Sequence, residues 1–147
     1  MTPTAALAYT LTISSTSDVY MDEPWVLIRW DQEHGCVFAD WRGFATSSEF
    51  QSGLTKALDV VRERQAVNLV SDTQKLESIS DEDQRWIRYT WTPLAATSGL
   101  RRVAVVLAPS GLSKMAIQTM FKGRRRTGLQ SRTFDGLADA LRWVGEA

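Results

Sequence analysis

The first third of the chain consists of short apolar runs, which predict β-strands. Residues 9–13 alternate between apolar and polar positions, and residues 18–21, 25–30 and 36–41 are further short runs rich in β-branched and aromatic side chains. The five residues from Asp31 to Gly35 suit a hairpin loop, because glycine supplies the positive φ that bulged turns need. Residues 1–8 precede the first strand as an N-terminal tail.

After Gly43 the apolar spacing becomes helical. Thr46 and Glu49 form a capping box, in which a hydroxyl and a carboxylate satisfy the free amides of a helix start. One apolar face follows at helical spacing: Phe50, Leu54, Ala57, Leu58 and Val61. Residues 66–70 then read as a buried strand that ends at Asp72, followed by a polar loop over residues 73–79.

A second helix is predicted to begin at Ser80. The carboxylates of residues 81–83 complement the positive end of its dipole. Pro93 interrupts the pattern, because proline disfavours helix at the residue before it but suits the first helical turn. We therefore expect a short new helix with Thr92 as its cap, ending at Gly99.

The last third alternates between strands and helices. Residues 101–108 form an apolar run typical of a strand covered on both faces, and residues 129–134 resemble an edge strand. A helix is expected over residues 112–122, with Leu112, Met115, Ala116 and Thr119 or Met120 on its apolar side. Asp135 is predicted to cap the last helix, whose apolar positions are Leu137, Ala140, Leu141 and Val144.

This order of elements predicts an α/β fold in a single domain over residues 9–147. Antiparallel strands come first and alternating helices and strands follow, which implies a mixed sheet with a parallel C-terminal portion and about four to five helices. The length of 147 residues and the 44% hydrophobic content agree with one globular domain.

Composition narrows the cellular context. A single cysteine, Cys36, cannot form an internal disulfide, and the N-terminus lacks the features of a signal peptide. No run is long enough to span a membrane. We therefore expect a cytoplasmic protein.

The net charge of zero conceals an asymmetry. Residues 1–83 carry 14 acidic and 6 basic side chains, a net of −8, whereas residues 84–147 carry 3 acidic and 11 basic side chains, a net of +8. Either the two halves mix their charges over one surface, or the molecule has a distinct basic face.

Two sets of side chains are candidates for binding. Asp72 is expected at the strand ends, where open α/β sheets bind ligands, although it could simply accept hydrogen bonds from the following loop. The second set is a run of four cations, more than a helix dipole needs: Lys122, Arg124, Arg125 and Arg126. These side chains could contact an acidic partner, a lipid surface or nucleic acid, or they could belong to a solvated loop. Nucleic acid is disfavoured, because no recognised motif is present and the pI is 6.6.

The sequence contains no convincing catalytic or cofactor site. His34 and Cys36 are the sole residues of their types, too few for a zinc site, and two residues apart they are a poor nucleophile pair. No glycine-rich phosphate loop is present, and we expect no cofactor. Of the six tryptophans, four or five are expected in the core, and an exposed one would mark an interface or pocket.

Several segments together resemble the small bacterial proteins grouped as STAS-like. They are residues 70–72, 79–86, 91–93, 102–106 and 134–143. Proteins of this group are also described as similar to the anti-sigma-factor-antagonist fold and the CRAL-TRIO lipid-transfer fold. The resemblance covers about residues 18–145. It implies a mixed sheet with helices packed mainly on one face, and a regulatory or ligand-carrying role without catalysis.

Ser80 departs from the pattern that the resemblance implies. Anti-sigma-factor antagonists are phosphorylated on a serine in an Asp-Ser-Ser-Gly turn, but here Ser80 is followed by Asp81 and Glu82. A phosphate would be repelled by these carboxylates. Ser80 is therefore interpreted first as a helix cap and second as a binding residue.

Two functional hypotheses follow. The first is a non-catalytic regulatory or protein-interaction module that binds a protein partner or a second copy of itself. The alternative is a carrier or sensor of a small apolar or anionic ligand.

Overall fold

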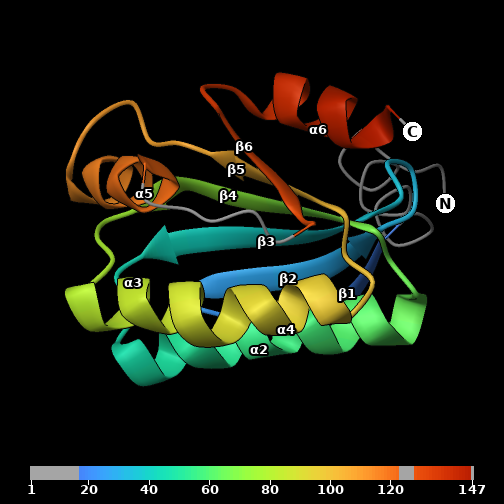
Figure 1. The fold of residues 1–147 in the computed structure, drawn as a ribbon, viewed down its shortest axis with the longest axis horizontal. Coiled ribbons are helices and arrows are strands. Elements are labelled where there is room, and N and C mark those ends of the chain that lie inside the picture. The colour runs from blue at the N-terminus through green and yellow to red at the C-terminus, as the bar shows by residue number, and fades with distance from the viewer. Residues whose placement is uncertain (1–16, 123–127, 147) are drawn as a thin grey trace, which may run out of the picture.

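The chain folds around one mixed β-sheet. The computed structural model describes residues 17–122 and 128–146, and within them six strands are hydrogen-bonded in chain order (Figure 1). The strands are β1 (Ser17–Glu23), β2 (Val26–Asp31), β3 (Cys36–Gly43), β4 (Asn68–Leu76), β5 (Arg102–Val106) and β6 (Gln130–Phe134). The helices are α2 (Ser47–Arg64), α3 (Asp81–Trp86), the π-helix η1 (Ile87–Trp91), α4 (Thr92–Thr97), α5 (Leu112–Lys122) and α6 (Leu137–Gly145).

The N-terminal half of the sheet is antiparallel, as the sequence predicts. β1 pairs with β2 and β2 with β3, and Gly35 takes a φ of 61° in the hairpin between them. Residues with a Cβ rarely adopt this conformation, which explains the glycine. Asp31 still pairs with Cys36, so the loop is one residue shorter than predicted. The predicted tail over residues 1–8 and strand over residues 9–13 lie outside the described residues.

The C-terminal half of the sheet is parallel, and strands that are consecutive in the chain are neighbours in it. β3, β4, β5 and β6 pair in parallel, with α2, the segment 81–97 and α5 as the three connections. β6 pairs with β5 at the end of the sheet, so its prediction as an edge strand is confirmed. The predicted mixed sheet is therefore confirmed.

β4 is longer than the sequence pattern indicates. The predicted loop over residues 73–79 is wrong for its first half, because β4 continues to Leu76. The ladder with β3 persists beyond a register shift, pairing Arg42 with Lys75 and Gly43 with Leu76. A long neighbouring strand thus holds polar residues in extended conformation, and Thr73 is buried there.

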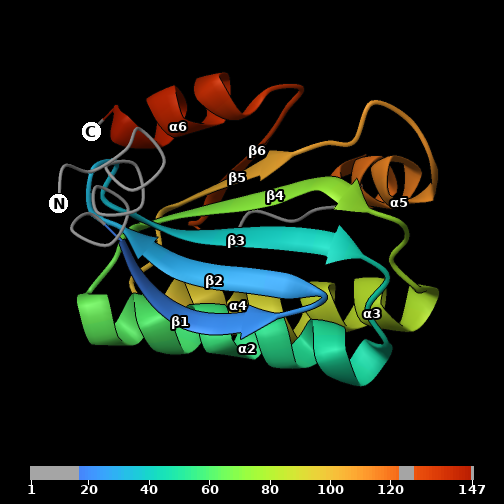
Figure 2. The same ribbon diagram turned by 180° about the vertical axis from the view of Figure 1, so that it is seen from behind.

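Helices cover the two faces unequally. α2, α3 and α4 lie on one face of the sheet and α6 lies on the other (Figures 1 and 2). The predicted apolar face of α2 is confirmed, since Phe50, Leu54, Ala57, Leu58 and Val61 are all buried in the larger core cluster. A smaller cluster joins Val70, Ala104 and Val106 of the sheet to Ala140 and Val144 of α6.

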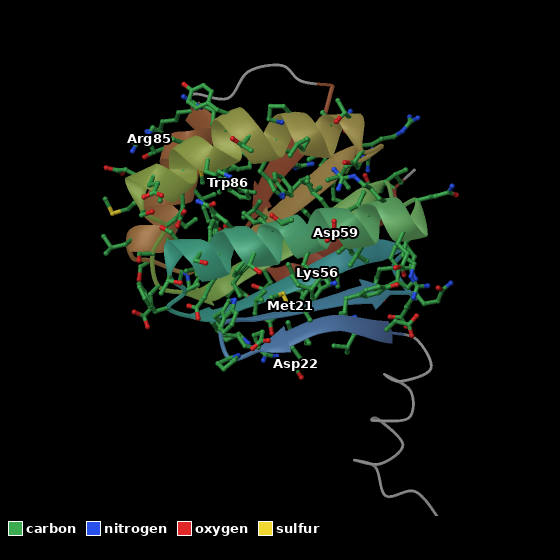
Figure 3. The ribbon with its side chains drawn as sticks, turned by 90° about the horizontal axis from the view of Figure 1, so that it is seen from below. Met21, Asp22, Lys56, Asp59, Arg85 and Trp86 are labelled. Atoms are coloured by element: carbon green, nitrogen blue, oxygen red, sulfur yellow. The ribbon has the colours of Figure 1, made fainter. Side chains whose placement is uncertain are left out.

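Residues 81–97 form one continuous helix, which corrects the predicted break at Pro93. α3, η1 and α4 follow one another without interruption, and we call them together the wall helix. Thr92 is not a cap: its backbone N–H donates to the Ile87 carbonyl, five residues earlier. This π-type turn tolerates Pro93, which has no N–H and would clash with the carbonyl of residue 89 in a regular helix. The wall helix lies beside α2 (Figure 3).

Two further local expectations are wrong. Leu112 and Met115 of α5 are 66% and 63% exposed, whereas Ser113 and Ile117 form its buried side. The face is shifted because α5 meets the sheet through Ile117, whose neighbours in the core the local pattern does not reveal. The last helix is capped by Gly136 without a side-chain bond, not by Asp135.

The tryptophans are less deeply buried than predicted. Trp41 and Trp91 are buried, while Trp25, Trp30, Trp86 and Trp143 are partly buried against the two clusters. The Trp41 and Phe50 rings lie in a tilted arrangement, with 4.8 Å between the ring centroids and 41° between the ring planes. No helix among the described residues has both the length and the apolar content to cross a bilayer.

Replacing Gly53 with Ala is expected to destabilise the fold, although alanine normally stabilises a helix. A Cβ at position 53 would lie 2.7 Å from Trp41 Cη2, and Trp41 is buried and hydrogen-bonded, so it cannot yield freely. Overpacking of this kind costs about 1–3 kcal/mol of unfolding free energy. Urea denaturation measures the effect, with the exposed Ser52→Ala on the same helix as the control. A G53A variant more stable than the parent protein would contradict this account.

Candidate functional site

Asp72, a predicted binding residue, lies inside β4 and not at a strand end. Alternation along β4 places it on the α6 face of the sheet, opposite Asp40 of β3. Its side chain accepts a hydrogen bond from the Gln74 backbone N–H (3.0 Å), which agrees with the structural alternative. Burial raises the pKa of Asp72, the Gln74 bond opposes that rise, and the nearby Asp40 adds to it.

Ser80 caps the wall helix. Its hydroxyl accepts a hydrogen bond from the Asp83 backbone N–H (3.1 Å), as predicted for a cap. The Asp83 carboxylate is buried and accepts bonds from Ser47 Oγ and Gln51 Nε2, both at 3.1 Å. These bonds join the start of the wall helix to α2.

Of the predicted binding residues that the structure describes, Asp72 and Ser80 lie on opposite faces of the sheet. Asp72 faces α6, whereas Ser80 begins a helix on the opposite face. Lys122 is the exposed last residue of α5. The predicted arginine run, Arg124 to Arg126, lies outside the described residues.

His34 and Cys36 are not arranged for nucleophilic chemistry. His34 Nδ1 lies 2.8 Å from Asp31 Oδ2 in the hairpin. Cys36 is fully buried in the cluster beneath α6, and burial raises the pKa of its thiol to about 12. The thiolate needed for attack is therefore scarce at neutral pH. The described residues hold no group of three or more potential metal ligands.

A cavity of about 590 Å³ lies between the sheet and the helices of the larger layer. Its lining is mainly aliphatic and aromatic. The strands contribute Trp41, Leu69, Ser71, Thr73, Val103, Val105, Gln130 and Ser131, together with Leu129 just before β6. The helices contribute Phe50 and Leu54 of α2, Ile117, Met120 and Phe121 of α5, and six residues of the wall helix, with Ile79 before it.

The π-turn of the wall helix forms one side of the cavity. Ile87, Arg88, Tyr89, Trp91 and Thr92 all line it, and Pro93 follows. The wider turn displaces these side chains from the positions that a regular helix would give them. π-turns of this kind are frequent at functional sites, so the irregularity agrees with a binding role.

Hydrogen bonds fix the two large aromatic walls. Trp41 Nε1 donates to Ser71 Oγ (3.1 Å), and Trp91 Nε1 donates to the Leu54 carbonyl (2.8 Å). Both indole N–H groups are thus satisfied by the protein, and the rings can present their carbon surfaces to the cavity. Thr73 Oγ1 likewise donates to the Val106 carbonyl (2.6 Å).

The pattern of the sequence does not predict these cavity residues. Two signals were present: Ser71 and Thr73 are polar residues spaced two apart on one face of a buried strand, and Pro93 lies inside a helical pattern. Neither signal defines a cavity by itself, because the space arises between elements distant in the chain.

Comparison with solved structures identifies the fold. The chain is similar to an uncharacterised protein of the DUF3478 family from Shewanella loihica PV-4, described as having a SpoIIAA-like fold. The TM-score is 0.51 and the identity 17%, over 87% of this chain and 93% of that one. The fold is SpoIIAA-like. The predicted STAS-like architecture is therefore confirmed, and at this identity the likeness concerns the fold alone. No family model and no curated protein matches the chain.

Replacing Asp72 with Asn is expected to raise the free energy of unfolding at pH 7. Because the folded-state pKa is raised, ionised Asp72 costs stability at neutral pH, and this cost disappears as the pH falls and the carboxyl is protonated in both states. The asparagine oxygen can still accept the Gln74 bond. Urea denaturation at pH 7 and about pH 4 should show a difference between D72N and the parent protein that shrinks at the lower pH.

The exposed Asp135 provides a matched control, since D135N removes a carboxylate that is not buried. A D72N variant less stable than the parent protein at pH 7, with D135N unchanged, would show that the ionised carboxylate stabilises the fold.

Proposed function

We propose that this protein is a non-catalytic, STAS-type binding module that holds a small, mainly apolar molecule in the cavity beside the π-turn. The observation that carries the proposal is the cavity itself. Its volume of about 590 Å³ lies within the range of about 300–1,000 Å³ that small-molecule sites occupy. Its lining of aromatic and aliphatic side chains with a few polar groups is also typical of such sites.

The chemistry of the lining favours an apolar occupant. The cavity is partly open to solvent, so either water or a ligand fills it. Water finds few hydrogen-bond partners against these walls, which favours its displacement by an apolar molecule.

The walls are also preorganised. The Trp41–Ser71 and Trp91–Leu54 hydrogen bonds hold both indoles in place before any ligand binds. A ligand therefore does not bear the entropic cost of ordering these large side chains, which improves affinity for a given contact area.

The protein-interaction hypothesis remains a prediction beside this one. Leu112 and Met115 lie one turn apart on α5 and both are mostly exposed, which offers an apolar surface to a partner or a second copy. A regulatory role could combine the two, with ligand binding altering this surface, because α5 also lines the cavity through Ile117. A cytoplasmic location also remains a prediction.

Binding of 1-decanol tests the proposal, with the substitution Val105→Phe to fill the cavity. Val105 lies on β5, lines the cavity and is half-buried, so a larger ring there would occupy the ligand's space. We expect saturable binding of one molecule per chain, followed through the tryptophan fluorescence, to which Trp41 and Trp91 of the lining contribute, and about tenfold weaker binding by V105F.

The control is Val19→Phe, the same change on a strand residue that is 56% exposed and is not part of the lining. V19F should bind as the parent protein does. Urea denaturation establishes that both variants fold. Absence of saturable binding to the folded parent protein, or equal affinities of V105F and V19F, would refute the cavity as a ligand site.

A further inference from the structure

We propose that the ligand of this cavity carries a single anionic group, in the simplest case a carboxylate on an apolar body, and that Arg88 binds this group. The inference rests on the proposed function and adds the ligand's charge. Among the described residues that line the cavity, Arg88 is the one cation, and none is an aspartate or glutamate. A site with this lining attracts one negative charge and has nothing to repel it.

Arg88 also differs from the other half-buried arginines of the described residues. Arg29, Arg42 and Arg64 each form an ion pair with an aspartate, and Arg102 donates to the Trp143 carbonyl. Arg88 is half-buried as well, yet in the described part of the chain it forms no ion pair. Every aspartate and glutamate of the sequence lies within that part.

The neighbourhood of Arg88 suits a bound carboxylate. Its guanidinium carbon lies over the Tyr89 ring, 6.0 Å from the ring centre, so the cation is close to an aromatic surface. The edge of a guanidinium carries N–H donors in a fixed fork that matches the two oxygens of a carboxylate. Such bidentate, charge-assisted bonds are stronger than neutral hydrogen bonds.

The described part of the lining supplies one cation, which matches a ligand with one negative charge. A doubly charged group would leave one negative charge uncompensated beside aliphatic and aromatic side chains, where an unpaired charge is costly. The remainder of the ligand would lie against Trp41, Trp91 and Val105, which have no charge to pair. We therefore infer a monoanionic amphipathic molecule.

Three probes with the same ten-carbon chain test this inference on the full chain at pH 7.5. They are decanoate, 1-decanol and decylammonium, which differ only in the charge of the head group. We expect decanoate to bind at least about tenfold more tightly than 1-decanol, and decylammonium more weakly than both. Calorimetry or tryptophan fluorescence gives the three dissociation constants.

Substitution of Arg88 assigns the effect to one side chain. Arg88→Gln should reduce the preference for decanoate over decanol, taken as the ratio of the two dissociation constants within that variant, to less than about threefold, and Arg88→Lys should retain part of the preference. The matched control is Arg85→Gln on the same helix. Arg85 is exposed and points away from the molecule, whereas its neighbour Trp86 lies on the side towards α2 (Figure 3). R85Q should keep the full preference.

The outcomes separate the two proposals. Equal affinities of the parent protein for decanoate and decanol would overturn the anionic ligand and leave the cavity as a binding site. An R88Q variant that is folded by urea denaturation and retains the full decanoate preference would overturn the role of Arg88. If none of the three probes binds, both the charged ligand and the proposed function fail.

Discussion

Successive side chains of β4 point to opposite faces of the sheet, and this alternation determines both the lining of the cavity and the contacts beneath α6. β4 is hydrogen-bonded to β3 on one side and to β5 on the other, so its register is fixed twice. Ser71 and Thr73 are thereby directed to the cavity, and Val70 and Asp72 to the α6 face. A slip of one residue would exchange the two sets and place a carboxylate in the apolar cavity.

Hydrogen bonds anchor the wall helix, which forms one side of the cavity, to its neighbouring helix α2. Asp83 joins its first turn to α2 through Ser47 and Gln51, and Trp91 joins its centre to the Leu54 carbonyl of α2. These bonds fix the position of the wall helix relative to α2. The side chains of β4, β5 and α5 do not fill the space between this helix and the sheet. The π-turn adds to this, because it turns bulky residues aside where Pro93 prevents a regular hydrogen bond.

Patterns among residues close in sequence predict most helices and strands, whereas the candidate site depends on contacts between residues far apart in the chain. The Thr46 capping box, the Gly35 hairpin and the apolar run of β5 depend on neighbours in the chain, and the structure confirms them. The extension of β4 to Leu76 depends on β3, since Arg42 pairs with Lys75 and Gly43 with Leu76, 33 residues apart, so no local pattern contained it. The same reason explains the candidate site: Asp72 and Ser80 were conspicuous in sequence but line no part of the cavity, whereas Arg88 became informative only when its surroundings were known.

The opposed charges of the two halves acquire a structural meaning at their boundary. The change from acidic to basic sequence falls after Asp83, inside the wall helix. The carboxylates of its first turn complement the helix dipole, and Asp83 is used in the bonds to α2. The part of the helix that faces the cavity belongs to the basic half, so Arg88 is placed there while no carboxylate enters the lining. A net charge of zero is thus compatible with an apolar cavity whose described lining includes the cation Arg88 and no carboxylate, because the acidic side chains that balance the total lie elsewhere.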